Sequence, residues 1–309
     1  MAGYALRLYR GHALDAPRVM AFLSEINRHP RFVADYYAGD FVWRSFRVPE
    51  ASSCESIALW EDARGQIAAI GFFDAPSEFS FAIDPGLADT PVEVAGVRDI
   101  IAWAEGLHDN GRGADDEPLG ATVRSDQAAV QRMLSEWGYR STGNPAYAGN
   151  FRRLDDTIVA PALPAGFEIV EMTDNADLHD RVEIHREVWA PSKFTVEVYA
   201  MLRAAPMYRQ DLDLAVRASD GRYASYLIGW WDPDAKLGLL EPVGARSSYR
   251  RLGLTKALIQ ETLRRFRELG ADRAFVNSLA NDVPSNALYR SAGFQRIAEW
   301  QSWSREERS

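Results

Sequence analysis

Two polar stretches in the C-terminal half contain the residue types that could do chemistry. In the first, Arg250-Arg251-Leu252-Gly253 follows an apolar segment, 238–245, that carries one acid, Glu241. Leu254, Leu258, Thr262 and Phe266 then recur every four residues, which predicts one face of a helix. The arginines and the glycine therefore stand where a helix begins, and a helix N-terminus offers free N–H groups and partial positive charge. This pattern predicts an anion site suited to phosphates or pyrophosphate.

The second stretch is 281–294, NDVPSNALYRSAGF, which predicts a helix that ends at Gly293 and carries Asn286 and Tyr289. A tyrosine has an ordinary pKa of about 10, so its phenol stays protonated at neutral pH and could donate a proton. Ordinary packing of Tyr289 on an amphipathic helix is the alternative. Asn286 could contact a ligand or cap its helix.

Both stretches resemble hallmarks of one enzyme family. Arg250-x-x-Gly253-x-Thr255 resembles the Arg/Gln-x-x-Gly-x-Gly/Ala signature of the GNAT superfamily of acyl-CoA-dependent N-acyltransferases. Thr255 departs from the signature, since it stands where the family has glycine or alanine. The 281–294 stretch resembles the second hallmark, a helix with an asparagine and a tyrosine before a Gly-Phe turn, and it follows in the family's order. The resemblance covers residues 166–309.

The resemblance implies acetyl-CoA as cosubstrate and roles for particular residues. Tyr289 would protonate the departing thiolate. Glu241 would act as general base, directly or through a water, or it would instead point away or bind the cationic group of the acceptor. The strand before the phosphate loop would contact the pantetheine arm through its backbone. The implied cofactor-binding residues are Val243, Gly244, Ala245, Arg250, Arg251, Leu252, Gly253, Leu254, Thr255, Lys256 and Asn286.

The length of 309 residues predicts two domains, because a single core rarely grows that large. Residues 155–165 contain two prolines and predict a linker between domains at 1–154 and 166–309. The same order of predicted strands and helices occurs in both halves, which indicates an internal duplication. The phosphate pattern is absent from the first half, where the chain after Ile83 reads DPGLADTPVEVAG.

The fold expected from the resemblance is α/β (α+β), with two GNAT-like domains that each have a mixed, mostly antiparallel sheet flanked by helices. The first copy would be degenerate, as in tandem members such as the mycothiol synthase type. Aligning Gly138 with Gly293 places Gln131 opposite Asn286 and Leu134 opposite Tyr289. Chance similarity between two α/β domains is the alternative explanation.

Composition limits the classes of partner. The net charge of -9 argues against nucleic acid and allows a cationic acceptor. Cys54 is the single cysteine, and no apolar run is long enough to span a membrane, so we expect a cytoplasmic protein without membrane attachment, as monomer or homodimer. The five histidines (His12, His29, His108, His179 and His185) show no metal-ligand spacing, so no metal is expected.

The expected function is therefore transfer of an acetyl group from acetyl-CoA to a small-molecule or peptide amine by direct attack. The alternative is a CoA-binding regulatory or scaffold protein without catalysis. No motif identifies the acceptor. Two groups of residues could shape the acceptor pocket. The first is His185 and Trp189 near the expected acceptor entrance, for which ordinary packing is the alternative. The second is Tyr208, Asp211 and Asp213 before a predicted hairpin, for which solvated loop charges are the alternative.

Overall fold

The computed structural model describes residues 3–28, 35–74, 76–112, 117–155, 157–173 and 176–305. The expectation for His29 lies outside these ranges. The first half contains β1 (Ala5–Leu8), α1 (Ala16–Asn27), α2 (Ala38–Ser45), α3 (Glu50–Ser56), β2 (Ile57–Glu61), β3 (Ile67–Asp74), β4 (Glu78–Ile83), η1 (Pro85–Leu87), α4 (Pro91–Leu107), η2 (His108–Arg112), β5 (Gly120–Arg124), α5 (Ala128–Glu136) and β6 (Tyr139–Arg153).

The second half repeats this order of elements. It contains β7 (Phe167–Glu171), α6 (Leu178–Val188), α7 (Val196–Arg203), η3 (Gln210–Leu212), β8 (Asp213–Ala218), β9 (Tyr223–Asp232), β10 (Leu237–Ala245), η4 (Ser247–Tyr249), α8 (Leu254–Glu268), β11 (Arg273–Leu279), α9 (Val283–Ser291) and β12 (Gln295–Arg305). No helix in the described ranges is both long and apolar enough to cross a bilayer.

Several helices begin at side chains that satisfy a free N–H group of the first turn. Thr90 accepts from the N–H of Glu93 at the start of α4, and Asp177 accepts from Asp180 at the start of α6. Asp282 does the same for α9. The start of α8 differs, because its N-cap residue is Gly253, which has no side chain to offer. Its first N–H groups therefore remain available to a ligand.

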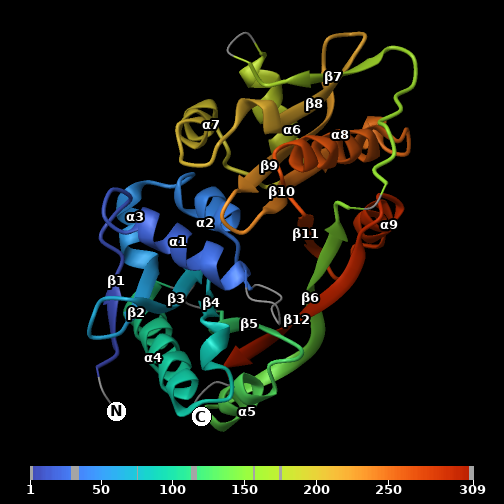
Figure 1. The fold of residues 1–309 in the computed structure, drawn as a ribbon. Helices are drawn as coiled ribbons and strands as arrows, with labels where there is room; N and C mark the ends of the chain where they lie inside the picture. The colour runs from blue at the N-terminus through green and yellow to red at the C-terminus, as the bar shows by residue number, and fades with distance from the viewer. Residues whose placement is uncertain are drawn as a thin grey trace.

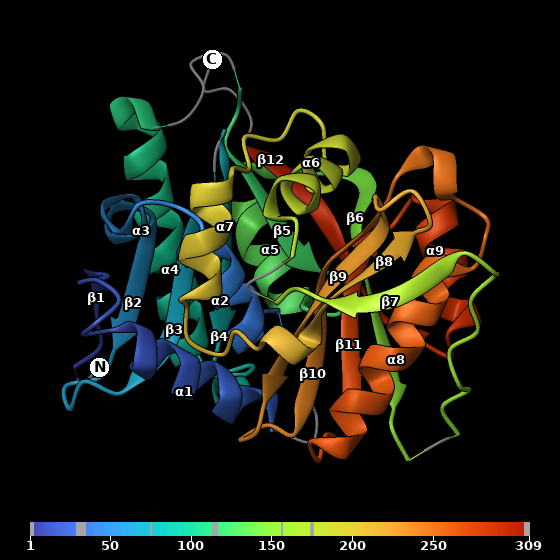
Figure 2. The same ribbon diagram turned by 90° about the horizontal axis from the view of Figure 1, so that it is seen from above.

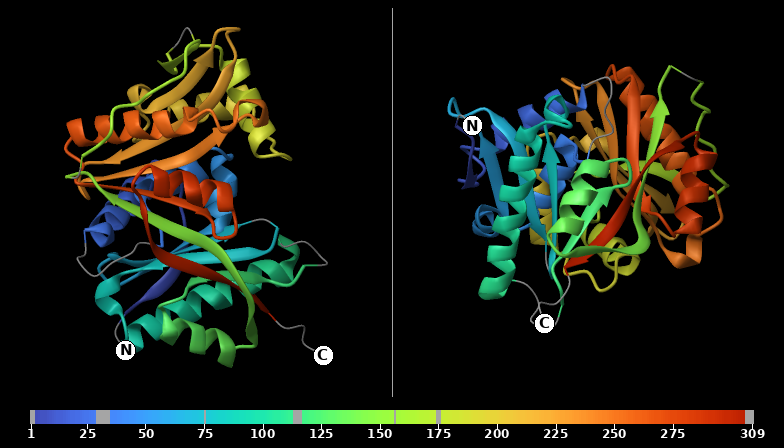
Figure 3. Two further views of the ribbon diagram at one scale, coloured as in Figure 1. Left: turned by 90° about the vertical axis from the view of Figure 1, so that its right-hand side faces the viewer. Right: turned by 90° about the horizontal axis from the view of Figure 1, so that it is seen from below.

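The strands of both halves form one 12-stranded sheet within the described ranges, in the order β1-β2-β3-β4-β5-β12-β6-β11-β10-β9-β8-β7. This order is symmetric about the β12–β6 pair. The last strand of each half pairs with the fifth strand of the other half, β12 with β5 and β6 with β11. Figures 1 and 3 show β6 and β12 running alongside each other between the halves. The two halves have thus exchanged their final strands.

Helices cover the sheet in layers that also join the halves. One cluster packs α4 and α5 against the first half of the sheet, and another packs α8 and α9 against the second. The remaining large cluster contains Leu23 and Phe41 of the first half together with Tyr199, Trp230 and Phe275 of the second. Helices α1 and α2 therefore lie between the two parts of the sheet (Figures 1 and 2), and their core is shared.

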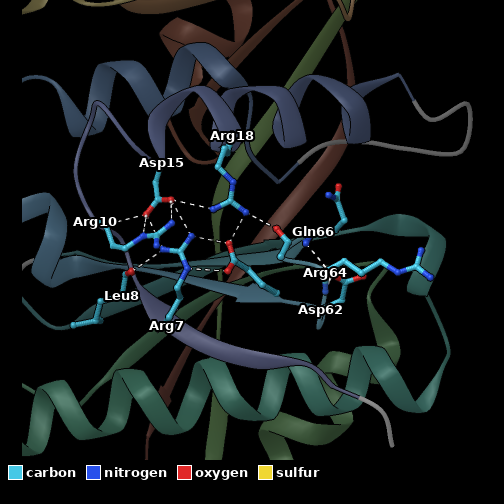
Figure 4. A network of polar contacts seen from close by, with 10 residues as sticks. Arg7, Leu8, Arg10, Asp15, Arg18, Asp62, Arg64 and Gln66 are labelled. Atoms are coloured by element: carbon cyan, nitrogen blue, oxygen red, sulfur yellow. Dashed lines mark hydrogen bonds and ion pairs between the residues drawn. The ribbon is translucent and has the colours of Figure 1, made fainter.

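An ion-pair network fixes α1 on its side of this core. Asp15, fully buried before α1, accepts from Arg7 at 2.7 Å and from Arg18 at 3.0 Å, and Arg10 joins them (Figure 4). Burial alone would raise the pKa of Asp15, but the hydrogen bonds from Arg7 and Arg10 lower it below its usual value. Arg7 and Arg18 also pair with Glu61 of β2. The network therefore joins β1, β2 and α1.

The fold class predicted from the sequence is confirmed, since the sheet is mixed and mostly antiparallel with helices on its faces. Strands predicted at 67–74, 78–83, 213–218 and 273–279 have those bounds. The aromatic-rich stretch 32–48, expected as a helix running into a strand or loop, contains α2 and the turn after it, and residues 32–34 lie outside the described ranges. The domain boundaries stay a prediction, and β6, placed in the first domain by that prediction, contributes to the sheet of the second half.

Candidate functional site

The predicted phosphate loop lies between β10 and α8. Leu254, Leu258, Thr262 and Phe266 are buried as the helix pattern requires. Ahead of them the backbone turns through two left-handed positions, Arg251 with φ 65° and Gly253 with φ 78°. Such turns aim successive N–H groups outward, and the helix dipole adds positive potential there. The connection therefore has the backbone of an anion cradle.

Cationic side chains at this loop are uncompensated. Arg250 and Arg251 are exposed, Lys256 is half-buried, and none of them forms an ion pair with a described residue. Arg246, just before the loop, behaves differently: it is 2 % exposed and binds Asp180 at 2.8 Å and Glu187 at 2.9 Å on α6. Arg246 thus anchors the loop, while the three free cations remain available for an anionic ligand.

Thr255, the residue that departs from the family signature, has a structural partner. Its hydroxyl lies 2.9 Å from Ser225 Oγ on β9, and Ser225 in turn donates to the carbonyl of Gly244 on β10 at 2.9 Å. The threonine therefore ties the start of α8 to two strands. Its hydroxyl is directed to Ser225, so it need not contact phosphate.

Strands β10 and β11 separate before the loop is reached. Their parallel pairing runs from Leu237–Arg273 to Leu239–Phe275 and ends there, although both strands continue. Val243, Gly244 and Ala245 are paired with β9. On β11, beyond the point where this pairing ends, the Oδ1 atom of Asn277 is buried and has no hydrogen-bond partner among the described residues. The opening and this unsatisfied acceptor fit the arm of an amide-bearing ligand such as pantetheine.

Glu241 lies at the bulge where β10 changes register against β9. Its carbonyl accepts from Trp230 Nε1 at 2.7 Å. Its carboxyl group is half-buried and hydrogen-bonded to the carboxyl group of Asp40, on α2 of the first half. Burial, and then the charge of Glu241, raise the pKa of Asp40 well above its ordinary value. The predicted base is therefore one member of a carboxyl pair.

Tyr289 lies on α9 and is packed in the cluster that α8 and α9 form on the second half of the sheet. It is 5 % exposed, and burial raises the pKa of its phenol above the ordinary value, with further increases from the charges of Asp282 and Glu241. The phenol is therefore protonated at neutral pH and can act as a donor. The influence of Glu241 places the two predicted catalytic side chains within electrostatic range of each other.

Residues 178–294 match the model of the acetyltransferase (GNAT) family, and this segment contains the loop, Glu241 and Tyr289. The chain contains a GNAT acetyltransferase domain. No curated protein sequence matches the chain.

Solved structures with the GNAT fold cover the whole chain. A tandem GNAT protein from the clavulanic acid biosynthesis pathway has a TM-score of 0.69 at 16% identity, with 99% of each chain covered. A GCN5-related N-acetyltransferase from Sphaerobacter thermophilus has a TM-score of 0.67 at 17% identity, covering 99% of this chain and 96% of that one. A GNAT-family acetyltransferase from Colwellia psychrerythraea has a TM-score of 0.58 at 8% identity, with 98% and 100% covered. At these identities the likeness shows the fold, which is that of a tandem GNAT protein.

Asn286 of the GNAT domain uses its amide to hold the β11–α9 loop. Its Nδ2 donates to the carbonyls of Leu279, Ala280 and Asp282 at 2.7–3.2 Å, and its Oδ1 accepts from Ser278 at 3.0 Å. Its direct contact with cofactor stays a prediction, because the amide already has these partners.

The suggested acceptor-side residues are mostly packed. His185 is 4 % exposed, its Nδ1 lies 2.8 Å from Tyr226 Oη, and burial lowers its pKa to about 3, so the ring is neutral at pH 7. Trp189 is half exposed and donates to the same hydroxyl. Asp213 is not a solvated loop charge, because it is fully buried and accepts from Tyr199 and Tyr208.

Reasoning from the sequence missed the residues that reach the GNAT site from elsewhere. Asp40 lies among the aromatic residues of the stretch 36–46, and an acid within such a stretch was the available signal. Asn277 lies inside a predicted strand without a motif. The described ranges contain no group of three or more His, Cys, Asp or Glu side chains that could hold a metal.

Proposed function

We propose that the protein is an acyl-CoA-dependent N-acyltransferase that moves an acetyl group from acetyl-CoA to an amine of a small molecule or peptide. The observation that carries this proposal is the uncompensated cationic loop at the start of α8, beside the opening between β10 and β11. Membership of residues 178–294 in the GNAT family supports acyl transfer in general. That the donor is acetyl-CoA and that the acceptor is an amine are the more specific parts of our proposal.

The residues fit acetyl-CoA, which would supply an acetyl group activated as a thioester. Val243–Ala245 lie beyond the point where β10 stops pairing with β11, so their backbone would receive the pantetheine arm, and the buried Asn277 Oδ1 on β11 would be a further acceptor. The N–H groups from Leu252 to Lys256, with the Arg250 and Arg251 side chains, would hold the pyrophosphate. Thr255 would contribute its backbone, since its hydroxyl binds Ser225.

Two side chains would move protons. An amine is protonated at neutral pH and must lose a proton before its nitrogen can attack, so Glu241 would take that proton from the bound ammonium group. As the nitrogen–carbon bond forms and the carbon–sulfur bond breaks, Tyr289 would donate its phenolic proton to the leaving sulfur. The proton that the nitrogen still has to lose would then restore Tyr289. No external redox partner is needed.

The remaining parts of the proposal concern context. We propose that the first half, 1–154, shapes the acceptor side or acts as a scaffold, and does not bind CoA. We further propose that the protein's partner is its amine acceptor, and that it binds neither nucleic acid nor a membrane. We place it in the cytoplasm as a monomer or homodimer. The alternative function, a CoA-binding regulatory or scaffold protein, predicts binding without turnover.

The test is an acetyl-CoA turnover screen over amino acids, polyamines, aminoglycosides and peptides, with release of the free thiol as readout. We expect turnover with at least one amine, and about 100-fold or greater loss of kcat in Glu241→Gln. Calorimetric titration with acetyl-CoA provides the parallel binding measurement. Binding without turnover of any amine would favour the scaffold alternative, and absence of binding would contradict both.

A further inference from the structure

We propose that Asp40 of the first half is a positioning residue for Glu241: it holds a proton and donates it in a hydrogen bond to the Glu241 carboxylate, so that both halves build the acyl-transfer site. This inference rests on the proposed function, in which Glu241 accepts the proton of the acceptor amine. It adds a residue outside the segment that matches the GNAT family.

Close packing of α2 against the second half brings Asp40 to Glu241. Gly39 lies directly over β9 and β10, and a Cβ atom there would come within 2.6 Å of Trp230 Cβ and 3.1 Å of Leu239 Cδ2. Only a residue without a side chain permits this approach. Trp230 in turn donates from Nε1 to the carbonyl of Glu241. The same contact therefore fixes both the helix that carries Asp40 and the backbone of Glu241.

The partners of Asp40 determine where the shared proton lies. Its Oδ2 accepts from the backbone N–H of Tyr37 at 2.9 Å, and the side chain is 5 % exposed. Two hydrogen-bonded carboxyl groups cannot both be ionised without strong repulsion, so the pair retains one proton. Asp40 is the more buried member, since its side chain is 5 % exposed and that of Glu241 is half-buried. Burial raises the pKa of Asp40 well above normal, so we assign the shared proton to Asp40.

The charged and polar groups around the Asp40–Glu241 pair do not neutralise its single negative charge. Arg44 of α2 acts on both carboxyl groups, but it also binds Asp74 of β3 at 2.6 Å. The other groups that interact electrostatically with the pair are Tyr36 and Tyr37 before α2, Arg47 after it, Tyr147 of β6 and Tyr289 of α9. Both arginines are cations that interact with Glu241, and the tyrosines, whose pKa values are raised, are neutral at pH 7. A half-buried Glu241 carboxylate beside the opening is thus ready for an ammonium group.

The arrangement gives the first half a chemical role. A half-exposed glutamate has several rotamers, and a hydrogen bond from a rigid, buried donor selects one. The described loop between β4 and α4 of the first half carries no cationic side chain, yet α2 of that half supplies this donor. Retention of the degenerate copy then follows from the active site as well as from the shared core.

The first experiment needs no acceptor. Infrared difference spectra between the wild type and Asp40→Asn at pH 7 should contain a protonated carboxyl C=O band that the substitution removes. Glu241→Gln, which leaves Asp40 in place, should shift the same band because it changes the hydrogen-bond partner. Absence of the band in the wild type would overturn the inference, and so would a band unaffected by both substitutions.

The second experiment is a double-mutant cycle on kcat with the most rapidly acetylated amine of the screen. Asp40→Ala should lower kcat about tenfold or more in the wild type, and by less than about threefold in the Glu241→Gln background. Asp40→Asn, which can still donate to Glu241 and accept from Tyr37, should recover most of the loss. Glu93→Ala is the control, since Glu93 makes the same kind of cap at the start of α4.

The outcomes separate the two proposals. If Glu241→Gln leaves kcat unchanged, the proposed role of Glu241 as base is wrong. If Glu241→Gln lowers kcat but Asp40→Ala has the same effect in both backgrounds, the proposed function stands and the inference about Asp40 fails.

Discussion

The two halves use the same strand-to-helix connection for different ends. Between β10 and α8 the loop carries Arg250, Arg251 and Lys256 without ion-pair partners in the described ranges, and Gly253 leaves the helix start uncapped. Between β4 and α4 the corresponding loop is acidic, and its N–H groups are satisfied by Thr90 and Glu93. In both halves the parallel strand pair separates after a few residues. The backbone alone therefore does not make a phosphate site. The charge of the loop and the capping of the helix determine whether the connection can bind phosphate.

The helices that follow carry a second difference. Asn286 on α9 and Gln131 on α5 both donate from their amides to carbonyls of the preceding strand or loop. The first half thus keeps this anchor although it lacks the cationic loop, which indicates a structural role for the amide. By contrast, Tyr289 corresponds to the buried apolar Leu134. The two copies therefore differ at the position of the proposed proton donor, Tyr289, and share the structural amide at the position of Asn286.

The largest effect is expected from separating the two copies. Residues 155–309 expressed alone lack β6, so β11 would present an unpaired edge, and we expect a fragment that aggregates or fails to unfold cooperatively. Coexpression with 1–154 should restore a soluble complex, measured by size-exclusion chromatography and circular dichroism. As control, a protease site placed in the linker of the intact protein should be cleaved without separating the halves. A monomeric, cooperatively folded 155–309 fragment would contradict this prediction.

The loop comparison is tested by exchanging its charges. Arg251→Glu with Gly253→Asp places two carboxylates in the cradle, and repulsion should weaken acetyl-CoA binding by about 100-fold or more in calorimetry. Asp89→Asn with Glu93→Gln, the matched change at the start of α4, should leave the Kd unchanged. Normal acetyl-CoA binding by the first variant would show that the cradle lies elsewhere.

The tyrosine difference predicts a loss in turnover. Tyr289→Phe should lower kcat about 100-fold, because a proton donor is removed, while the Kd of acetyl-CoA changes little. Tyr139→Phe is the control in the first half, where the hydroxyl donates to Glu105 at 3.2 Å. Equal kcat for Tyr289→Phe and the wild type would remove Tyr289 from the mechanism.

The smallest effects are expected from the shared amide. Asn286→Ala should lower the free energy of unfolding by about 2 kcal/mol and Gln131→Ala by about 1 kcal/mol, in line with the number of hydrogen bonds lost. Acetyl-CoA binding should change little in either variant. If Asn286→Ala instead weakens acetyl-CoA strongly while unfolding is unaffected, the asparagine contacts the cofactor and the comparison with Gln131 fails.

Local patterns of the sequence predicted most of the elements and the loop. The four-residue spacing from Leu254 to Phe266 marked the buried face of α8, and glycine beside arginine marked its start. The exchange of β6 and β12 was not predictable, because a strand's own sequence does not state which distant strand it pairs with. The contact of Asp40 with Glu241 depends on the same long-range packing. The hydrogen bond of Thr255 to Ser225 was also not predictable, because it too joins residues far apart in the sequence.

The exchanged strands also constrain the order of events during synthesis. The first half leaves the ribosome before the second, but β5 receives its neighbour β12 only when residues 295–305 have been made. Until then β5 has an open edge, and β6 lacks both of its neighbours, β11 and β12. The nascent chain must therefore keep its first half from pairing wrongly until translation is nearly complete, and folding finishes in both halves together.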